Sequence, residues 1–147
     1  MSLAMSKAAR EAFLAETRPG ILSVAEPQRG PLAVPIWYSY EPGGVVRFVT
    51  GGASRKAKLL GAAKRASLCV QTETPPYKYV SVEGPVSIGE PDHERDSRAM
   101  ALRYLGPELG AVYLELTASE REGSVLVTLT PERWWSVDYE NLVAATR

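Results

Sequence analysis

The fold of this 147-residue chain is constrained most by a series of short apolar runs that proline- and glycine-rich turns separate. Runs of this length, rich in β-branched and aromatic residues, are typical of strands. Several of them follow one another through hairpin turns, so their pairing is expected to be mostly antiparallel. The expected strands are Ile21–Ala25, Leu32–Tyr40, Val45–Thr50, Ala66–Thr72, Lys78–Ile88 and Ser124–Thr130, with Trp134–Asp138 as a candidate extension of the sheet.

Six or seven short strands must close into a barrel or sandwich to protect their edges. Proline cannot donate to a strand ladder, so Pro35 predicts an edge or bulge, and Gly84-Pro85 predicts a bend. Neither linker, repeat nor low-complexity segment interrupts the pattern, so one domain over residues 1–147 is expected. Helical patterns cover Lys7–Thr17, Ser54–Ala66, Glu90–Leu105 and Glu108–Ser119, and the tail from Glu140 to Ala145 is weakly helical.

Composition excludes several classes of function. With 45% hydrophobic residues the chain can bury a substantial core, and its formal net charge is zero with a pI of about 6.6. This balance argues against nucleic acid or an anionic membrane as a partner. A single cysteine excludes an intrachain disulfide. With only one cysteine and one histidine, we expect no metal site built from the protein's own side chains. No apolar run approaches the length of a transmembrane helix, so a cytoplasmic protein is expected.

One strand ends in a turn of unusual composition. Val45–Thr50 is followed by Gly51 and Gly52, and Ser54 then stands where a helix N-cap would stand. Serine is preferred there because its side-chain oxygen accepts a hydrogen bond from an otherwise unpaired backbone N–H. Glycine lets the backbone approach a ligand closely. The sequence therefore predicts a strand, a tight turn and a capped helix.

Three cations, Arg55, Lys56 and Lys58, lie at the start of that helix. A helix N-terminus carries partial positive charge and attracts anions, so cations there are unfavourable unless something negative offsets them. Local violations of this kind tend to mark functional sites. We infer a docked phosphate or similar anion, and the alternative is an exposed, solvated basic face.

Three segments resemble the flavin-binding split-barrel superfamily, whose best-known member is pyridoxamine 5′-phosphate oxidase. The resemblance extends from about Ala12 to about Trp135. The Ser-Arg-Lys turn is moderately specific by itself, and its place between two strands makes it stronger. The segments are the N-terminal helix with Gly20–Val24 and Pro35–Tyr38, the turn formed by Thr50 and Ser54–Lys56, and the stretch Ala66–Gly84.

This resemblance implies a mainly β fold with short helices, a six-stranded antiparallel split β-barrel of Greek-key type. It also implies a homodimer that holds two cofactors at the subunit interface, each ring lying between the two protomers. Arg55 and Lys56 would bind the terminal phosphate of the cofactor. The other cofactor-binding residues that it implies are Thr50 and Ser54 through their hydroxyls, Gly51 through its backbone, Lys58 for a further anionic group, the strand Pro35, Ile36 and Trp37 through its backbone, and Gln71 through its side chain.

The C-terminal stretch departs from the true pyridoxamine phosphate oxidases. Those enzymes read the substrate phosphate with further arginine and histidine, whereas Arg133–Tyr139 has no histidine. In its small size, its Arg-Lys-x-Lys turn and its aromatic C-terminal stretch, the chain is more similar to the actinobacterial branch that uses the deazaflavin coenzyme F-420.

The resemblance implies an oxidoreductase that transfers a hydride between coenzyme F-420 and a small unsaturated organic acceptor. One alternative keeps the fold and uses FMN, and another is a non-enzymatic cofactor carrier or binding module. A flavin or deazaflavin carries the hydride chemistry itself, so no acid–base pair is required. The sequence identifies no catalytic side chain.

Overall fold

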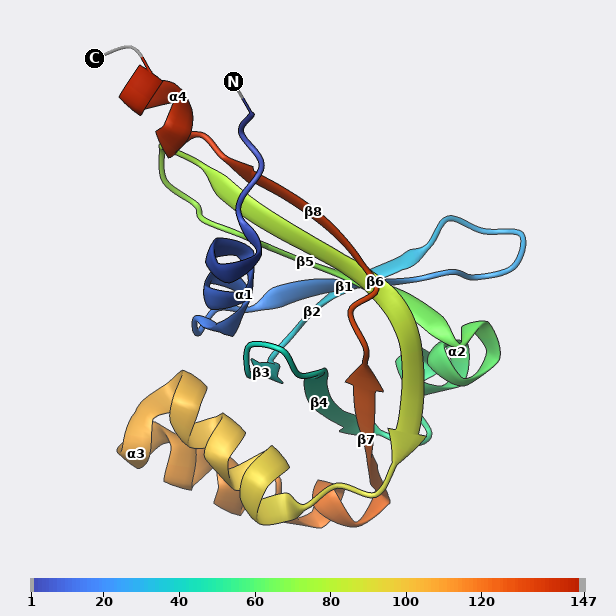
Figure 1. Cartoon of the computed structure of the whole chain (residues 1–147). Coiled ribbons are helices and arrows are strands. Elements are labelled where there is room, and N and C mark those ends of the chain that lie inside the picture. The colour runs from blue at the N-terminus through green and yellow to red at the C-terminus, as the bar shows by residue number, and fades with distance from the viewer. Residues whose placement is uncertain (1, 146–147) are drawn as a thin grey trace.

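Alternating buried and exposed residues build eight strands in the computed structural model, which describes residues 2–145 (Figure 1). In β1, for example, Leu22 and Val24 are buried while Ile21 is exposed. The strands are β1 (Gly20–Val24), β2 (Leu32–Ile36), β3 (Ser39–Tyr40), β4 (Val46–Gly51), β5 (Arg65–Gln71), β6 (Lys78–Gly89), β7 (Ser124–Leu129) and β8 (Arg133–Asp138).

All strand pairs are antiparallel, and they follow the order β2-β1-β5-β6-β7-β4-β3, with β8 pairing to β6. β6 is the longest strand, and Figure 1 shows it curving strongly along its length. Its first part pairs with β5 and β8, and the part from Val86 onward pairs with β7. The expected class, mainly antiparallel β with short helices, is confirmed as a half-barrel.

The expected number of six strands is wrong for two reasons. The run Leu32–Tyr40 divides into β2 and β3 at Trp37 and Tyr38, and the candidate extension Trp134–Asp138 is part of a strand, β8, of its own. The break follows from Tyr104, whose hydroxyl accepts a hydrogen bond from the Tyr38 N–H at 3.1 Å and lies 3.0 Å from the Tyr38 carbonyl oxygen. A side chain therefore takes the place of a neighbouring strand at this point.

The helices lie close to the expected ranges. α2 ends before the expected Ala66, because Lys64 takes a left-handed conformation (φ 63°) and β5 begins at the next residue. α3 contains the expected break at Gly106 (φ 81°) and Pro107. The helical segments are α1 (Lys7–Ala15), α2 (Arg55–Ala63), a π-helical turn η1 (His93–Arg98), α3 (Ala99–Leu116), a 3-10 segment η2 (Ala118–Gly123) and α4 (Glu140–Ala145).

The core lies between the inner face of the sheet and the helices α1 and α2. Phe13 and Leu14 from α1 and Leu60 from α2 pack against strand residues such as Leu68 and Leu129. The Tyr38 hydroxyl donates to the Leu14 carbonyl at 2.7 Å, which ties α1 to the break between β2 and β3. None of the described helices is long and apolar enough to cross a membrane.

Candidate functional site

The predicted strand, turn and capped helix are present between β4 and α2. Ser54 is the N-cap of α2, and its Oγ accepts a hydrogen bond from the Ala57 N–H at 3.1 Å. Thr50 Oγ1 lies 3.4 Å from Ser54 Oγ. The Gly52 N–H donates to the Gly123 carbonyl at 2.8 Å, and a Cβ at Gly52 would lie only 3.0 Å from that oxygen. A side chain at the second position of the turn would therefore be crowded against the backbone of Gly123.

The three cations at the start of α2 have different surroundings. Arg55 forms an ion pair with Glu26 in the loop between β1 and β2, and the guanidinium lowers the pKa of that carboxyl. Lys58 is exposed and is not among the residues that line the cavity described below. Glu26 thus supplies part of the negative charge that we expected an external anion to supply.

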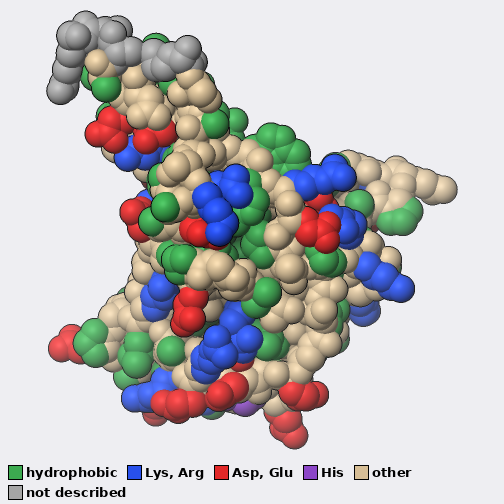
Figure 2. Space-filling view, in the orientation of Figure 1, with side chains coloured by type: hydrophobic (Ala, Val, Ile, Leu, Met, Phe, Trp, Pro, Cys, Tyr) green, Lys and Arg blue, Asp and Glu red, His purple; other side chains and the backbone are tan. Residues whose placement is uncertain are grey.

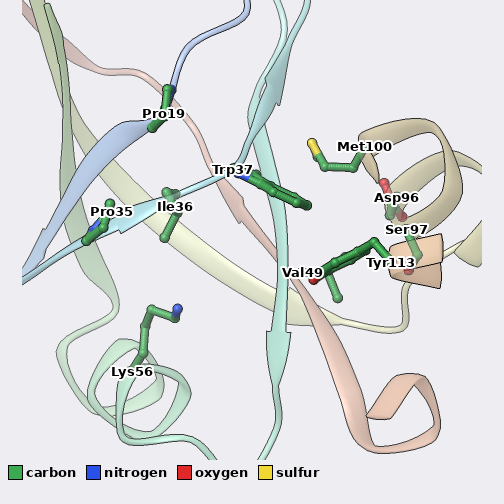
Figure 3. Close-up of a pocket in the computed structure, with 10 residues that line it drawn as sticks. All are labelled: Pro19, Pro35, Ile36, Trp37, Val49, Lys56, Asp96, Ser97, Met100 and Tyr113. Atoms are coloured by element: carbon green, nitrogen blue, oxygen red, sulfur yellow. The ribbon is translucent and has the colours of Figure 1, made fainter. Parts of the chain in front are cut away.

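Lys56 is the cation that faces a cavity. Its side chain is partly buried, and burial lowers the pKa of its ammonium group. No hydrogen bond or ion pair joins this ammonium to any residue in the range 2–145. Figure 3 shows the side chain pointing from α2 toward the strand that carries Pro35 and Ile36. A desolvated cation without a partner is the pattern expected where an anion is to bind.

The cavity beside Lys56 has a volume of about 450 Å³. One wall is apolar and comes from the end of β2 and from β4. The opposite wall comes from η1 and α3 (Figure 3). The lining residues are Pro19, Pro35, Ile36, Trp37, Val49, Lys56, Asp96, Ser97, Met100 and Tyr113.

Two tyrosines of α3 fix the ring of Trp37. Tyr104 stacks on it with ring centroids 5.2 Å apart and an interplanar angle of 7°, and Tyr113 contacts it at 5.1 Å with a tilt of 53°. Burial raises the pKa of Tyr104, and its single hydroxyl hydrogen points toward the carbonyls of Arg18 at 2.9 Å and Tyr38 at 3.0 Å. The cavity wall therefore has a defined aromatic surface.

A buried ion pair closes the other side of the cavity. Asp96 is only 2% exposed, and the Arg47 guanidinium of β4 donates to its two oxygens at 2.8 and 2.9 Å. The Asp92 N–H donates to the same carboxylate at 2.9 Å. The pairing with Arg47 offsets the free energy of burying the Asp96 side chain, which would be unfavourable for an isolated charge.

The structure brings together only part of the predicted site. Pro35, Ile36, Trp37 and Lys56 line one cavity. Thr50 and Gly51 line an adjoining hollow of about 390 Å³ that shares Val49 and Tyr113 with the first. Ser54, the helix cap, lines neither cavity, and its Oγ lies 3.4 Å from Oγ1 of Thr50. Arg55 and Lys58 have the separate environments described above.

Gln71 is not among the residues that line this cavity. It is the last residue of β5, whose register places Cys69 opposite Ile21 of β1, so the end of β5 runs toward the level of Pro19 in the cavity lining. The role of Gln71 at a cofactor stays a prediction.

Sequence reasoning missed the wall that η1 and α3 contribute. Asp96, Met100 and Tyr104 stand four residues apart, which places them on one helix face, and this spacing was a readable signal. Asp96 was hidden in a run of charges, and its partner Arg47 lies 49 residues away. Tyr113 follows the break at Gly106, so its approach to Trp37 depends on a backbone turn that spacing alone does not fix.

Comparisons with known proteins agree with this architecture. A family model described as pyridoxamine 5′-phosphate oxidase matches residues 6–138. The structure of a conserved hypothetical protein from Mycobacterium tuberculosis is 26% identical with a TM-score of 0.78, and the match covers 96% of this chain and 89% of that one. No curated protein matches the chain.

Two further structures share the fold at lower identity. An F-420 reductase is 20% identical with a TM-score of 0.63, over 85% of this chain and 94% of its own. An FAD-binding protein from Mesorhizobium loti is 21% identical with a TM-score of 0.63, over 90% of this chain and 92% of its own. At these identities the likeness shows the fold alone. Because the family model covers nearly the whole described chain, this protein belongs to the pyridoxamine 5′-phosphate oxidase family.

Proposed function

We propose that the protein is an oxidoreductase that binds coenzyme F-420 and transfers a hydride between it and a small unsaturated organic acceptor. The observation that carries this proposal is the unpaired, partly buried ammonium of Lys56 at the edge of a cavity with an apolar, aromatic wall. Family membership and the fold shared with an F-420 reductase support a redox role.

The residues of the cavity fit such a cofactor. A volume of about 450 Å³ is within the range of small-molecule sites. The strand around Ile36 and Trp37 offers a flat apolar surface for a ring, and Lys56 offers a charge for a phosphate. The N-terminus of α2 adds partial positive charge beside Lys56, since the first N–H groups of a helix point outward along its axis.

A bound deazaflavin or flavin would supply the hydride chemistry. The chain's own residues would bind and orient it. Lys56 would attract the phosphate, and Trp37, fixed by Tyr104, would exclude water from one side of the ring. Ser97 and Tyr113 place hydroxyl groups on the opposite wall, where they can donate hydrogen bonds to a polar atom of the acceptor.

We also propose that the protein works as a homodimer. Several large apolar side chains are exposed on the described chain, among them Trp135 at 52% and Leu116 at 78%. Gln71 does not line the cavity of its own chain, and we propose that it acts on a cofactor held together with a second copy. A site shared between protomers would account for both features.

Cofactor titration tests the function. Purified protein from a host that makes no deazaflavin is titrated with F-420 and with FMN, and absorbance and fluorescence report binding. We expect binding of F-420, followed by oxidation of the reduced coenzyme when a panel of conjugated acceptors is added. A protein that is purified yellow with bound FMN would favour the flavin alternative. Binding without turnover of any acceptor would favour a carrier, and binding of neither cofactor would refute the proposal.

A further inference from the structure

A second cavity, of about 460 Å³, lies between the β3–β4 hairpin and the start of α3. Its lining includes three arginines, Arg47, Arg95 and Arg103, and a single carboxylate, Glu41. On the face of the molecule that Figure 2 shows, Lys and Arg side chains are interspersed with acidic ones. Nothing in the proposed function uses this cavity.

Each of the three guanidinium groups keeps donors that no described residue accepts from. Arg47 uses its Nε and Nη2 atoms on Asp96, which leaves Nη1. Arg103 donates from Nη2 to the Ala15 carbonyl at 2.8 Å and also contacts the Tyr104 side chain, and its remaining N–H groups are free to bind a ligand. The side chain of Arg95 has neither an ion pair nor a hydrogen bond to residues 2–145. The cavity thus presents several unused charged donors.

The second cavity is separate from the one that contains Lys56. The ion pair stands between them, since Asp96 lines the first cavity and Arg47 lines the second. Met100 is the one lining residue that the two share. An anion in the second cavity can therefore contact Arg47 without contacting Asp96.

The charges in the second cavity do not balance. Asp96 compensates Arg47, so Glu41 alone opposes Arg95 and Arg103. Arginine binds phosphate through parallel N–H bonds that are about twice as strong as neutral ones. Tyr40 and Met100 add apolar surface that suits an organic group. We propose that this cavity binds a small phosphate-bearing molecule, with Arg95 and Arg103 as its main contacts.

The test uses inorganic phosphate as the probe and isothermal titration calorimetry as the measurement. The background is Lys56→Met, which removes the cation of the first cavity. We expect this variant to bind phosphate still. Adding Arg95→Gln and Arg103→Gln should weaken that binding by about tenfold or more, because two charge-assisted contacts are lost. Arg98→Gln is the matched control, since Arg98 lies in the same segment, pairs with Glu94 and does not line the cavity.

A variant that is expected to bind phosphate more tightly controls for loss of binding through misfolding. Glu41→Gln in the same background removes the one opposing charge and should tighten phosphate binding. Absence of phosphate binding in Lys56→Met overturns the proposal, as does binding that survives the loss of Arg95 and Arg103. The cofactor titration of the unmodified protein is a separate experiment, so failure here and failure of the proposed function are distinguishable.

Discussion

At the scale of single residues, two neighbouring cations show what sequence can and cannot predict. The N-cap at Ser54 and the basic turn were readable, because local spacing determines them. That Arg55 would pair with Glu26, while Lys56 would face a cavity without a partner, depends on how the β1–β2 loop folds over α2. Arg55 and Glu26 are 29 residues apart, so their contact leaves no pattern in the local sequence. Only the structure therefore distinguishes the role of Arg55 from that of Lys56.

The lowered pKa of Lys56 has a consequence for stability. The folded state disfavours the charged form relative to the unfolded chain, whose lysine has a pKa near 10.5. The charged ammonium therefore destabilises the cofactor-free protein at neutral pH, and this penalty disappears as pH rises through the lowered pKa toward 10.5. Lys56→Met should unfold at a higher temperature than the unmodified protein at pH 7, because the unfavourable charge is gone. Thermal unfolding from pH 7 to pH 11 would show the difference shrinking.

Glu26 should restrain Arg55 from binding a cofactor phosphate. The pKa of Glu26 is lowered by Arg55, so the pair persists above the ordinary value of 4.5 and is lost as pH falls through the lowered one. Glu26→Gln frees Arg55 at neutral pH and removes a repulsive charge. We expect it to tighten cofactor binding by about threefold, measured by fluorescence titration at pH 7. Weaker binding would contradict this role.

At the scale of elements, the sequence predicted where strands and helices lie better than where they end. The alternating run Leu32–Tyr40 looks continuous, but the Tyr104 hydroxyl takes the backbone bonds of Tyr38 and divides it. The bend expected at Gly84-Pro85 exists because β6 changes partners there, from β5 to β7. A hydroxyl that replaces a neighbouring strand as a hydrogen-bond partner leaves no trace in the hydrophobic pattern. Glycine and proline, in contrast, mark bends in a strand by their own residue type.

Gly84 should tolerate no side chain. A Cβ there would lie 1.8 Å from the carbonyl oxygen of Thr130, a backbone atom that cannot rotate away. Gly84→Ala should lower the free energy of unfolding by about 3 kcal/mol, through the backbone shift it forces. Gly89→Ala, in the same strand with no atom within 4 Å of its Cβ, is the control and should cost far less. Urea denaturation of both variants measures the difference, and equal costs would contradict the steric argument.

At the scale of the whole molecule, we propose that two chains complete the candidate site. The cavity has an open side, and Gln71 is not among its lining residues. The fold class was predictable because strand-forming runs and turns are local features. Which residues gather around the cavity depends on the placement of α3, which no single-sequence pattern specifies.

Mixed dimers test this shared site. If Lys56 of one protomer and Gln71 of its partner serve the same cofactor, a dimer of Lys56→Met and Gln71→Ala chains has one intact site. Each variant dimer alone should bind cofactor weakly, and the mixture should regain high-affinity binding at about half the sites of unmodified protein. Titration of purified mixed dimers checks this. No recovery, or unchanged binding by Gln71→Ala alone, would contradict a site built from two chains.

The central claim is that Lys56 binds the phosphate of a redox cofactor, and a matched pair of lysine variants tests it most directly. Dissociation constants for F-420 and FMN are measured for the unmodified protein, for Lys56→Met and for Lys58→Met, which removes an equal charge from an exposed position two residues away. We predict that Lys56→Met weakens binding by about tenfold or more and that Lys58→Met changes it little. Equal effects of the two substitutions, or none from either, would contradict the account.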